Sequence, residues 1–228
     1  MKSRKALVLL SGGQDSTTCL YWAKNRFGSI EAIGFNYGQR HVRELEIAST
    51  TAQEAGVSYY IATVNTLSDV SENALTKNSI DVEESVTAGM PPNTLVEGRN
   101  LLFLTYAAIY AKSKGINDLV IGVSQTDYSN YPDCREQFIR SAENSLSLAM
   151  DYKFTVHAPL MWRTKAETWL LADELGVLNI IRHNTLTCYN GIIGDGCGNC
   201  PACKLRKKGW DEYVFSSKFK VQSSKFKV

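Results

Sequence analysis

A short segment near the N-terminus combines the residue types of a phosphate-binding loop. It reads Ser11-Gly12-Gly13-Gln14-Asp15-Ser16-Thr17 and lies between a strand-length apolar run and a helical pattern. The glycines let the backbone turn tightly and direct its N–H groups at an anion, and the next helix adds its positive N-terminal end. Asp15 repels bare phosphate, so we expect it to stand in the first turn of the helix or to bind magnesium carried by a nucleotide.

The pattern of this loop narrows the nucleotide chemistry. The chain contains no Gly-x4-Gly-Lys-Ser/Thr, which excludes a Walker A loop, and the segment is not the Gly-x-Gly-x-x-Gly of dinucleotide folds. It resembles instead the pyrophosphatase loop of the adenine-nucleotide α-hydrolase-like superfamily, and that resemblance implies cleavage of ATP between the α and β phosphates. The residues expected to hold ATP are Leu10, Ser11, Gly12, Gly13, Gln14, Asp15, Ser16, Thr17, Thr18, Cys19 and Leu20.

Four of the six cysteines form a second candidate site. They are Cys188, Cys197, Cys200 and Cys203. Such clustering in a chain without a secretory signal indicates metal binding more than disulfides, and four thiolates close a tetrahedral zinc site. The Cys-x2-Cys-x2-Cys spacing followed by Pro201 also resembles ferredoxin-type iron–sulfur ligation, without its last cysteine. We expect one structural zinc ion per chain, with an iron–sulfur cluster as the alternative.

Length and composition fit a globular protein with its own core. The chain has 228 residues, 44% hydrophobic and 21% charged, which is enough to bury a core without disulfides. No apolar run approaches the roughly 18 residues of a membrane helix and no signal peptide is evident, so we expect a cytoplasmic protein without membrane contact.

The net charge of +2 is unevenly distributed. Residues 204–228 hold eight lysines and arginines against two acids, a charge of +6, whereas residues 1–203 hold 17 against 21, a charge of −4. An acidic body argues against a broad nucleic-acid-binding surface. We therefore expect small-molecule substrates and no direct contact with nucleic acid.

Alternating strand and helix patterns must position both sites. Strands are predicted at 6–10, 30–35, 58–64, 118–123 and 154–157, and helices at 15–27, 44–55, 100–114, 133–150 and 164–174. This rhythm favours a parallel sheet with helices on both faces. Thr164 and Glu167 have the spacing of a capping box. The predicted fold is α/β: a Rossmann-like, doubly wound, five-stranded parallel sheet, followed by a small metal-binding portion made of helix and loop.

The chain divides into three portions by pattern. Residues 1–180 are predicted to form the nucleotide-binding catalytic domain, residues 181–215 the zinc-binding portion with a short helix from about Ala202, and residues 216–228 a basic tail. The tail repeats one six-residue sequence, and we expect it to be solvated or weakly ordered. Residues 66–98 interrupt the strand–helix pattern, and so long an insertion is usually functional or mobile.

Several blocks in the right order resemble one family, the 7-cyano-7-deazaguanine synthases, over roughly residues 5 to 210. The blocks are Ser11–Thr18, Asn36–His41, Gly98–Asn100, Thr126–Tyr128, Tyr131–Arg135, Ala158–Leu160, Lys165–Glu167 and Thr187–Tyr189, which leads into the cysteines. Glu97 stands where we expect proline in the family, so we expect a looser turn before Arg99. The repeated tail also lies outside the family pattern.

The resemblance implies an ATP-dependent ligase acting on 7-carboxy-7-deazaguanine. ATP would adenylate the carboxylate, and ammonia would displace AMP to give an amide. A second ATP would activate the amide oxygen, and elimination would give the nitrile for queuosine or related deazaguanine biosynthesis. The resemblance also implies ATP with Mg²⁺ as co-substrate, a structural zinc and a homodimer.

Catalysis of this kind rests on positioning and charge stabilisation. We predict Asp15, Ser16, Arg99 and Lys165 as catalytic residues, with Arg99 and Lys165 stabilising phosphate charge. Tyr128, Tyr131 and Asp133 follow a predicted strand, where open α/β sheets bind ligands. They are expected to contact the deazaguanine, although a surface salt bridge for Lys165 and a helix cap for Asp133 are alternative roles.

Other functions share parts of this pattern. A tRNA-thiolating or lysidine-forming enzyme would carry the same loop, but its RNA would require basic surface; a gel shift with tRNA separates the two. A glutamine-dependent amidotransferase would need a glutaminase domain, for which this chain lacks the length. We therefore expect free ammonia or a partner to supply the nitrogen. A zinc-ribbon interaction module with an inactive nucleotide fold would form no AMP.

Overall fold

The computed structural model describes residues 3–39, 43–64, 73–76, 79–80, 83, 93–126 and 131–225, with side chains described to residue 217. Tyr128 of the predicted substrate residues, and Arg40 and His41 of one family block, lie outside these ranges. In chain order the elements are β1 (Lys5–Leu9), α1 (Gln14–Lys24), β2 (Ser29–Asn36), α2 (Arg43–Glu54), β3 (Ser58–Thr63), α4 (Arg99–Ser113), β4 (Asp118–Val120), η1 (Pro132–Cys134), α5 (Glu136–Met150), β5 (Thr155–His157), α6 (Lys165–Glu174), α7 (Leu178–Asn184) and α8 (Pro201–Lys225).

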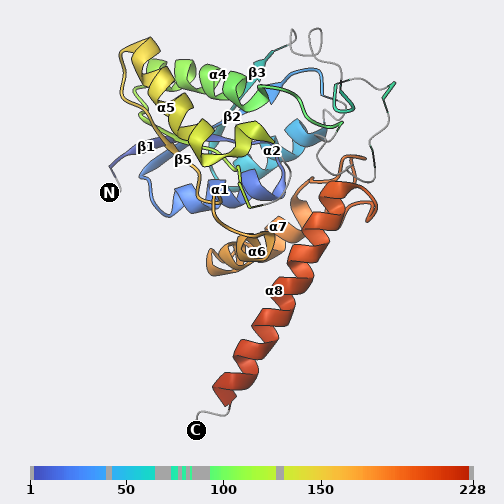
Figure 1. Ribbon diagram of the computed structural model, residues 1–228. Helices are drawn as coiled ribbons and strands as arrows, with labels where there is room; N and C mark the ends of the chain where they lie inside the picture. The colour runs from blue at the N-terminus through green and yellow to red at the C-terminus, as the bar shows by residue number, and fades with distance from the viewer. Residues whose placement is uncertain are drawn as a thin grey trace.

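Five parallel strands form one sheet in the order β3-β2-β1-β4-β5 (Figure 1). The central strand β1 pairs with β2 on one side and β4 on the other, so that Leu7 lies opposite Glu31 and Leu119. The chain therefore winds outward in both directions from β1. The predicted five-stranded, doubly wound parallel sheet is confirmed, and its switch point between β1 and β4 is where such sheets bind ligands.

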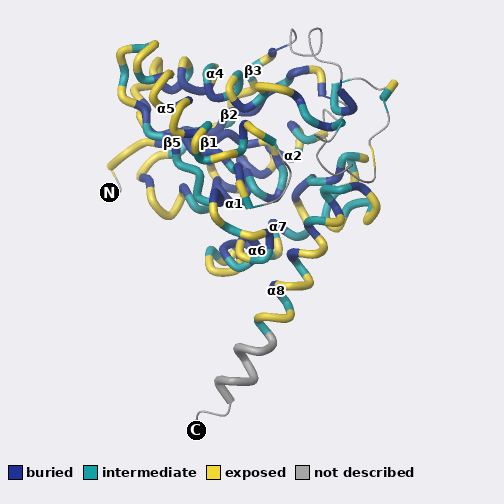
Figure 2. Tube along the Cα trace, in the orientation of Figure 1, coloured by how far each residue is buried: buried dark blue, intermediate teal, exposed yellow. Residues whose placement is uncertain are grey.

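Side-chain alternation along β1 builds a core on each face of the sheet. Leu7 and Leu9 pack with α4 and α5 in one cluster, whereas Ala6, Val8 and Leu10 pack with α1 and α2 in the other. Successive strand residues point to opposite faces, so one apolar run supplies both layers. Figure 2 shows the resulting concentration of buried residues on the strands at the centre of the molecule.

The helices α6, α7 and α8 pack together beside this body (Figure 1). Trp169 of α6, Ile181 of α7 and Tyr213 of α8 share one buried cluster. The sequence predicted only a short helix from about Ala202, whereas α8 extends over 25 residues to Lys225. The helix α7 was not predicted, because seven residues are too few to establish a period.

The predicted helix 133–150 begins later than expected. Residues Pro132–Cys134 form a 3-10 turn, and α5 begins at Glu136. Pro132 occupies the first position of that turn, where the missing N–H costs nothing. The division into 1–180, 181–215 and 216–228 stays a prediction, although α8 runs unbroken across residue 215. Within the described residues, none of the helices combines the length and the apolar character needed to cross a membrane.

Candidate functional site

The predicted phosphate loop connects β1 to α1 as a tight, glycine-dependent turn. Gly12 has φ +80°, and a Cβ there would lie 2.7 Å from the carbonyl oxygen of Glu44, so only glycine fits beside α2. The hydroxyls of Ser11 and Ser16 lie 3.0 Å apart, and the Ser16 hydroxyl also donates to the Gly13 carbonyl at 3.3 Å. Gly13 is the N-cap of α1 and supplies no capping side chain. The helix N-terminus therefore presents N–H groups where an anion binds.

A second glycine lets α1 approach the sheet closely at this point. A Cβ on Gly122, two residues after β4, would lie 2.9 Å from the backbone carbon of Asp15 and from the backbone nitrogen of Ser16. The contact holds the first turn of α1 at the carboxyl end of β4. This places the loop at the switch point of the sheet, where folds of this kind bind ligands.

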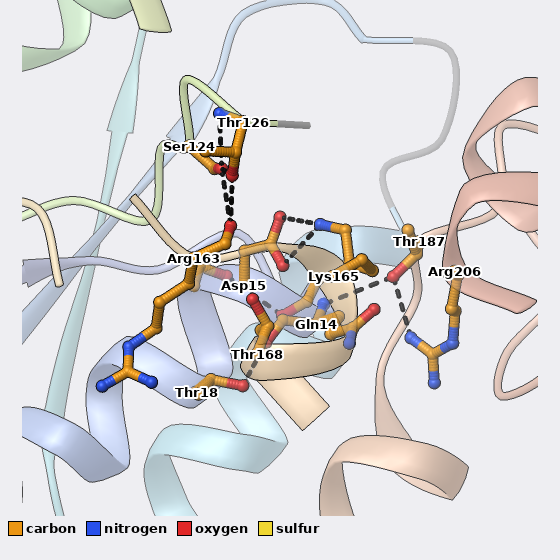
Figure 3. Close-up of polar contacts among 12 residues, drawn as sticks. Gln14, Asp15, Thr18, Ser124, Thr126, Arg163, Lys165, Thr168, Thr187 and Arg206 are labelled. Atoms are coloured by element: carbon orange, nitrogen blue, oxygen red, sulfur yellow. Dashed lines mark hydrogen bonds and ion pairs between the residues drawn. The ribbon is translucent and has the colours of Figure 1, made fainter. Parts of the chain in front are cut away.

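An ion pair joins α1 to α6 above the loop. The Nζ atom of Lys165 lies 2.9 and 3.0 Å from the two carboxylate oxygens of Asp15 (Figure 3). Lys165 is 8% exposed, whereas the Asp15 side chain is 30% exposed. Lysine side chains are rarely this buried unless their charge is paired, and here the ion pair holds the charge in a fixed position. The structure thus brings together two residues separated by 150 positions in the sequence.

The start of α6 is fixed from two sides. Thr164 accepts from the Glu167 backbone N–H at 3.2 Å, and the Glu167 carboxylate accepts from the Thr164 N–H at 2.8 Å, which confirms the predicted capping box. The preceding carbonyl, that of Arg163, accepts from the hydroxyls of Ser124 and Thr126 (Figure 3). These bonds therefore fix the backbone of Lys165, the first residue of α6, beside the end of β4.

Arg99 lies in a group of tyrosines next to the loop. Its Nη1 is 3.5 Å from the Tyr37 hydroxyl, and the Tyr131 hydroxyl is 2.7 Å from the hydroxyl of Thr94. Burial lowers the pKa of Arg99, but Tyr37, Tyr131 and Asp133 outweigh this effect and raise the pKa above its ordinary value. The guanidinium thus stays charged in a largely aromatic environment, the surroundings that suit a flat anionic ligand.

The charges of the loop and of the Arg99 group both act on Cys134. Burial, followed by the negative charge of Asp133, raises the pKa of the Cys134 thiol to about 12, Arg99 opposes the rise, and Asp15 adds to it. Charges from both groups therefore reach the same side chain. Glu44, on α2, belongs to the same region: burial raises its pKa to about 7, against the opposing charge of Arg99.

The four clustered cysteines meet at one point. Their sulfur atoms all lie within 4.8 Å of one another, and three of the residues are buried. A Cβ on Gly196 would lie 2.3 Å from the Cys203 sulfur, so a glycine there is required for the sulfurs to converge. Backbone N–H groups, that of Cys200 first, lower the pKa of Cys197 to about 6. Four converging cysteine sulfur atoms fit a zinc ion, which binds cysteines as thiolates.

The structure groups the predicted residues in different ways. Asp15, Ser16 and Lys165 share the loop site. Arg99 and Tyr131 share the tyrosine group, close to Asp133. The Asp133 carboxylate accepts from the backbone N–H of Asn100 at 2.9 Å, so it caps α4, and its role toward a substrate stays a prediction.

Some members of the predicted ATP segment serve the core. Leu10, Cys19 and Leu20 are at most 1% exposed and pack between α1 and the sheet. Ser11, by contrast, is exposed, and Ser16 is buried beside it. The assignment of the whole Leu10–Leu20 segment to ATP stays a prediction, and its apolar members have only backbone groups to offer.

Sequence reasoning missed several residues of the site. Tyr37, Glu44 and Tyr189 belong to the Arg99 group. Thr187 is bonded to the loop, and Arg206 is bonded to Thr187. Tyr37 and Thr187 were part of family blocks without an assigned role. Arg206 had no local signal, because a basic residue on a basic helix looks solvated.

Comparisons of the sequence and of the fold identify proteins to which this chain is similar. Residues 5–214 match the family model "Queuosine biosynthesis protein QueC". The chain is similar to the 7-cyano-7-deazaguanine synthase of Phocaeicola vulgatus, with 56% identity over 94% of this chain and 96% of that one. It is also similar to that of Clostridium acetobutylicum, with 54% identity over 93% and 96%. Among solved structures, the U34-tRNA thiolase NcsA from Methanococcus maripaludis has 20% identity and a TM-score of 0.49, over 78% of this chain and 59% of that chain.

Proposed function

Because the chain belongs to the QueC family of 7-cyano-7-deazaguanine synthases, ATP-dependent ligases of queuosine biosynthesis, we propose how its residues divide the reaction. The acid substrate is 7-carboxy-7-deazaguanine. Its carboxylate oxygen attacks the α-phosphorus of ATP and pyrophosphate leaves. Ammonia then attacks the carbonyl carbon and AMP departs, leaving the amide. The amide oxygen attacks the α-phosphorus of a second ATP and pyrophosphate leaves, and loss of AMP and of both amide protons then gives the nitrile.

The loop site is assigned to ATP. The N–H groups of Gly12, Gly13, Asp15 and Ser16, together with the Ser11 and Ser16 hydroxyls, bind the departing pyrophosphate, since this end of α1 favours anions. Asp15 binds the magnesium ion that arrives with ATP, and Lys165 is then released from the ion pair to compensate phosphate charge. The Asp15–Lys165 pair at 2.9 Å carries this assignment, because it supplies one group for the metal and one for the phosphate.

The Arg99 group is assigned to the acid. Tyr131 and Tyr37 supply aromatic surface for the deazaguanine ring, and Arg99 supplies the positive charge where carboxylate and phosphate react. Charges of both Arg99 and Asp15 reach Cys134, which supports a shared reaction space. Tyr128 and Asp133 remain predicted contacts of the base.

The cysteine site is assigned to a structural zinc ion held by Cys188, Cys197, Cys200 and Cys203. Four protein ligands leave no open position for a substrate. A colourless protein with one zinc per chain is expected, and absorbance at about 400 nm, typical of an iron–sulfur cluster, would contradict zinc. A homodimer, a cytoplasmic location and the absence of direct nucleic-acid contact stay predictions.

Mass spectrometry of a reaction with ATP, magnesium, ammonia and 7-carboxy-7-deazaguanine tests the scheme. Two AMP molecules should appear for each nitrile, with the amide as a transient species. Asp15→Asn and Ser16→Ala should abolish turnover at unchanged metal content. Asp211→Asn, an exposed acid on α8, is the matched control with wild-type turnover. Nitrile formation by Asp15→Asn at the wild-type rate would overturn the assignment of the loop.

A further inference from the structure

The segment between α7 and the cysteines is bonded directly to the phosphate loop. The Leu186 N–H donates to the Gly12 carbonyl at 2.9 Å, and the Gln14 N–H donates to the Thr187 hydroxyl at 3.3 Å. These bonds hold the backbone on both sides of Gly13. The loop conformation therefore depends on where Leu186 and Thr187 are placed.

Arg206 places that segment. Its Nη1 donates to the hydroxyls of Thr185 at 2.8 Å and Thr187 at 2.9 Å, and its Nη2 donates to the carbonyls of Ile181 and Arg182, both at 2.9 Å. The residue is 3% exposed. A planar guanidinium with four fixed acceptors holds the segment in one geometry. The Thr187 hydroxyl, shared by Gln14 and Arg206, is the link between guanidinium and loop (Figure 3).

The cysteine site places Arg206 in turn. The helix α8 begins at Pro201, between two of the clustered cysteines. Arg206 lies three residues after Cys203, on the same face of the helix. Its backbone carbonyl accepts from the indole N–H of Trp169 at 3.3 Å, and its guanidinium lies 5.0 Å from the centre of that ring. The first turns of α8 are thus fixed by the sulfur cluster at one end and by α6 along the side.

We propose that Arg206 is a positioning residue for ATP binding, acting through Thr187 on the Gly12–Gln14 backbone, and that the cysteine site supports ATP binding by this route. The inference rests on the assignment of the loop to ATP. Arg206 itself touches neither ATP nor the acid, since its four hydrogen bonds go to the segment 181–187. Loss of its contacts therefore weakens ATP binding and leaves binding of the acid unchanged.

Conservative substitutions of Thr187 test the link between Arg206 and the loop with the least disturbance of the fold. Thr187→Val removes the shared acceptor, and Thr187→Ser keeps it. Thr187→Val should raise the Kd and the KM for ATP about tenfold, the loss of roughly one hydrogen bond at the loop. The KM for the acid and the zinc content should remain those of the wild type. Thr187→Ser should restore most of the affinity, which a purely steric effect would not do.

Arg206→Met extends the test to the guanidinium. It should reproduce the loss of ATP affinity, and Arg206→Lys should recover part of it because an ammonium still reaches the hydroxyls. The double variant Arg206→Met/Thr187→Val should lose no more than the larger single loss, since both changes break one chain of bonds. Lys208→Met, on an exposed part of the same helix, is the control with wild-type affinity.

Two results would overturn the inference. One is an unchanged Kd for ATP in Thr187→Val, and the other is tighter binding, which would mean that Thr187 competes with phosphate for the Gln14 N–H. The Thr187 pair decides the question even where Arg206→Met does not fold. If the wild-type chain bound no ATP, the loop assignment itself would fail, and that outcome is distinct from a variant that binds normally.

Discussion

At the residue scale, the central feature is a buried cation held beside a partly exposed carboxylate. Asp15 and Lys165 satisfy each other's charge before a nucleotide binds. Removing one partner of a buried pair leaves the other charge uncompensated. In the proposed function each partner exchanges onto a ligand, magnesium for Asp15 and phosphate for Lys165, so that neither charge is left unpaired.

Lys165→Met should therefore impair chemistry more than nucleotide binding. The variant loses the cation that compensates charge as pyrophosphate departs, and we expect turnover to fall about 100-fold or more. AMP release measures this loss, and binding of ATP without the acid measures affinity. Lys112→Met, an exposed lysine on α4, should keep wild-type turnover. Turnover of Lys165→Met within threefold of wild type would show that the ion pair of Lys165 with Asp15 is only structural.

Glu44 predicts a pH dependence of stability. Burial raises its pKa in the folded chain to about 7, against an ordinary value of 4.5. The folded state therefore binds more protons between these values, and stability falls as pH rises through that window. Glu44→Gln should match the wild type at pH 5 and exceed it at pH 8 by about 1–2 kcal/mol, or roughly 2–8 °C in Tm.

Thermal unfolding of both proteins at the two pH values measures this difference. Glu46→Gln, an exposed neighbour on α2, provides the control. Parallel Tm curves for the wild type and Glu44→Gln would show that Glu44 ionises alike in the folded and unfolded chain.

At the element scale, α8 packs against α6 so closely that a single glycine is required. A Cβ on Gly209 would lie 2.6 Å from the Cβ and Cγ atoms of Lys165 and 2.8 Å from its carbonyl carbon. The long helix thus packs directly against the first residue of α6, Lys165. Arg206 and Gly209, one turn apart, make α8 a support for both the loop and Lys165.

Gly209→Ala should push α8 away from α6. In an exposed helix, alanine is more stable than glycine by about 1 kcal/mol. Here the overpacking costs about 1–3 kcal/mol, so we expect a net loss of stability. AMP formation should fall as well, because Lys165 moves. Ser216→Ala, an exposed site on the same helix, gives the effect of alanine without the contact. A more stable, fully active Gly209→Ala would contradict the packing.

The elements themselves were predictable to different degrees. Strands β1 to β3 and helices α1, α2 and α4 lie within a few residues of the predicted ranges, because each has a long apolar pattern bounded by glycine or polar residues. The capping box at Thr164 was a local signal and is confirmed. The short α7 and the length of α8 had no such signal, since their stability comes from Trp169 and Tyr213 packing across helices.

From spacing alone, the site was predictable only where its residues are neighbours in the sequence, whereas Arg99, Lys165 and Tyr131 were predicted through the family resemblance. The loop and the cysteine cluster each lie within a short segment, so spacing revealed them. The Gln14–Thr187 bond joins positions 173 residues apart, and no local pattern encodes such a contact. Asp133 shows the same limit, because the sequence offered it as a cap of its own predicted helix at 133–150. That helix begins only at Glu136, and the Asp133 carboxylate instead accepts from the N–H of Asn100 in α4.

At the whole-molecule scale, the chain contains a sheet body and a cysteine-dependent support that meet at the loop. The body has its own cores on both faces of the sheet. The region around the cysteines has only a small cluster that includes Leu186 and the cysteine side chains. So small a core gains little from burial, and we expect metal binding at the four cysteines to supply the missing free energy.

Removal of the metal should therefore loosen one part of the molecule and spare the other. Hydrogen exchange of residues 185–206 should accelerate about 100-fold or more in the metal-free chain, whereas exchange in β1, β2 and β3 should change little. The loop reports the connection: amides of Gly12 to Gln14 should exchange faster although they lie in the body, because Leu186 and Thr187 no longer hold them. Restoring zinc should reverse both effects. Uniform acceleration over the whole chain would mean a single cooperative unit, and an unchanged loop would mean that the cysteine site stabilises only itself.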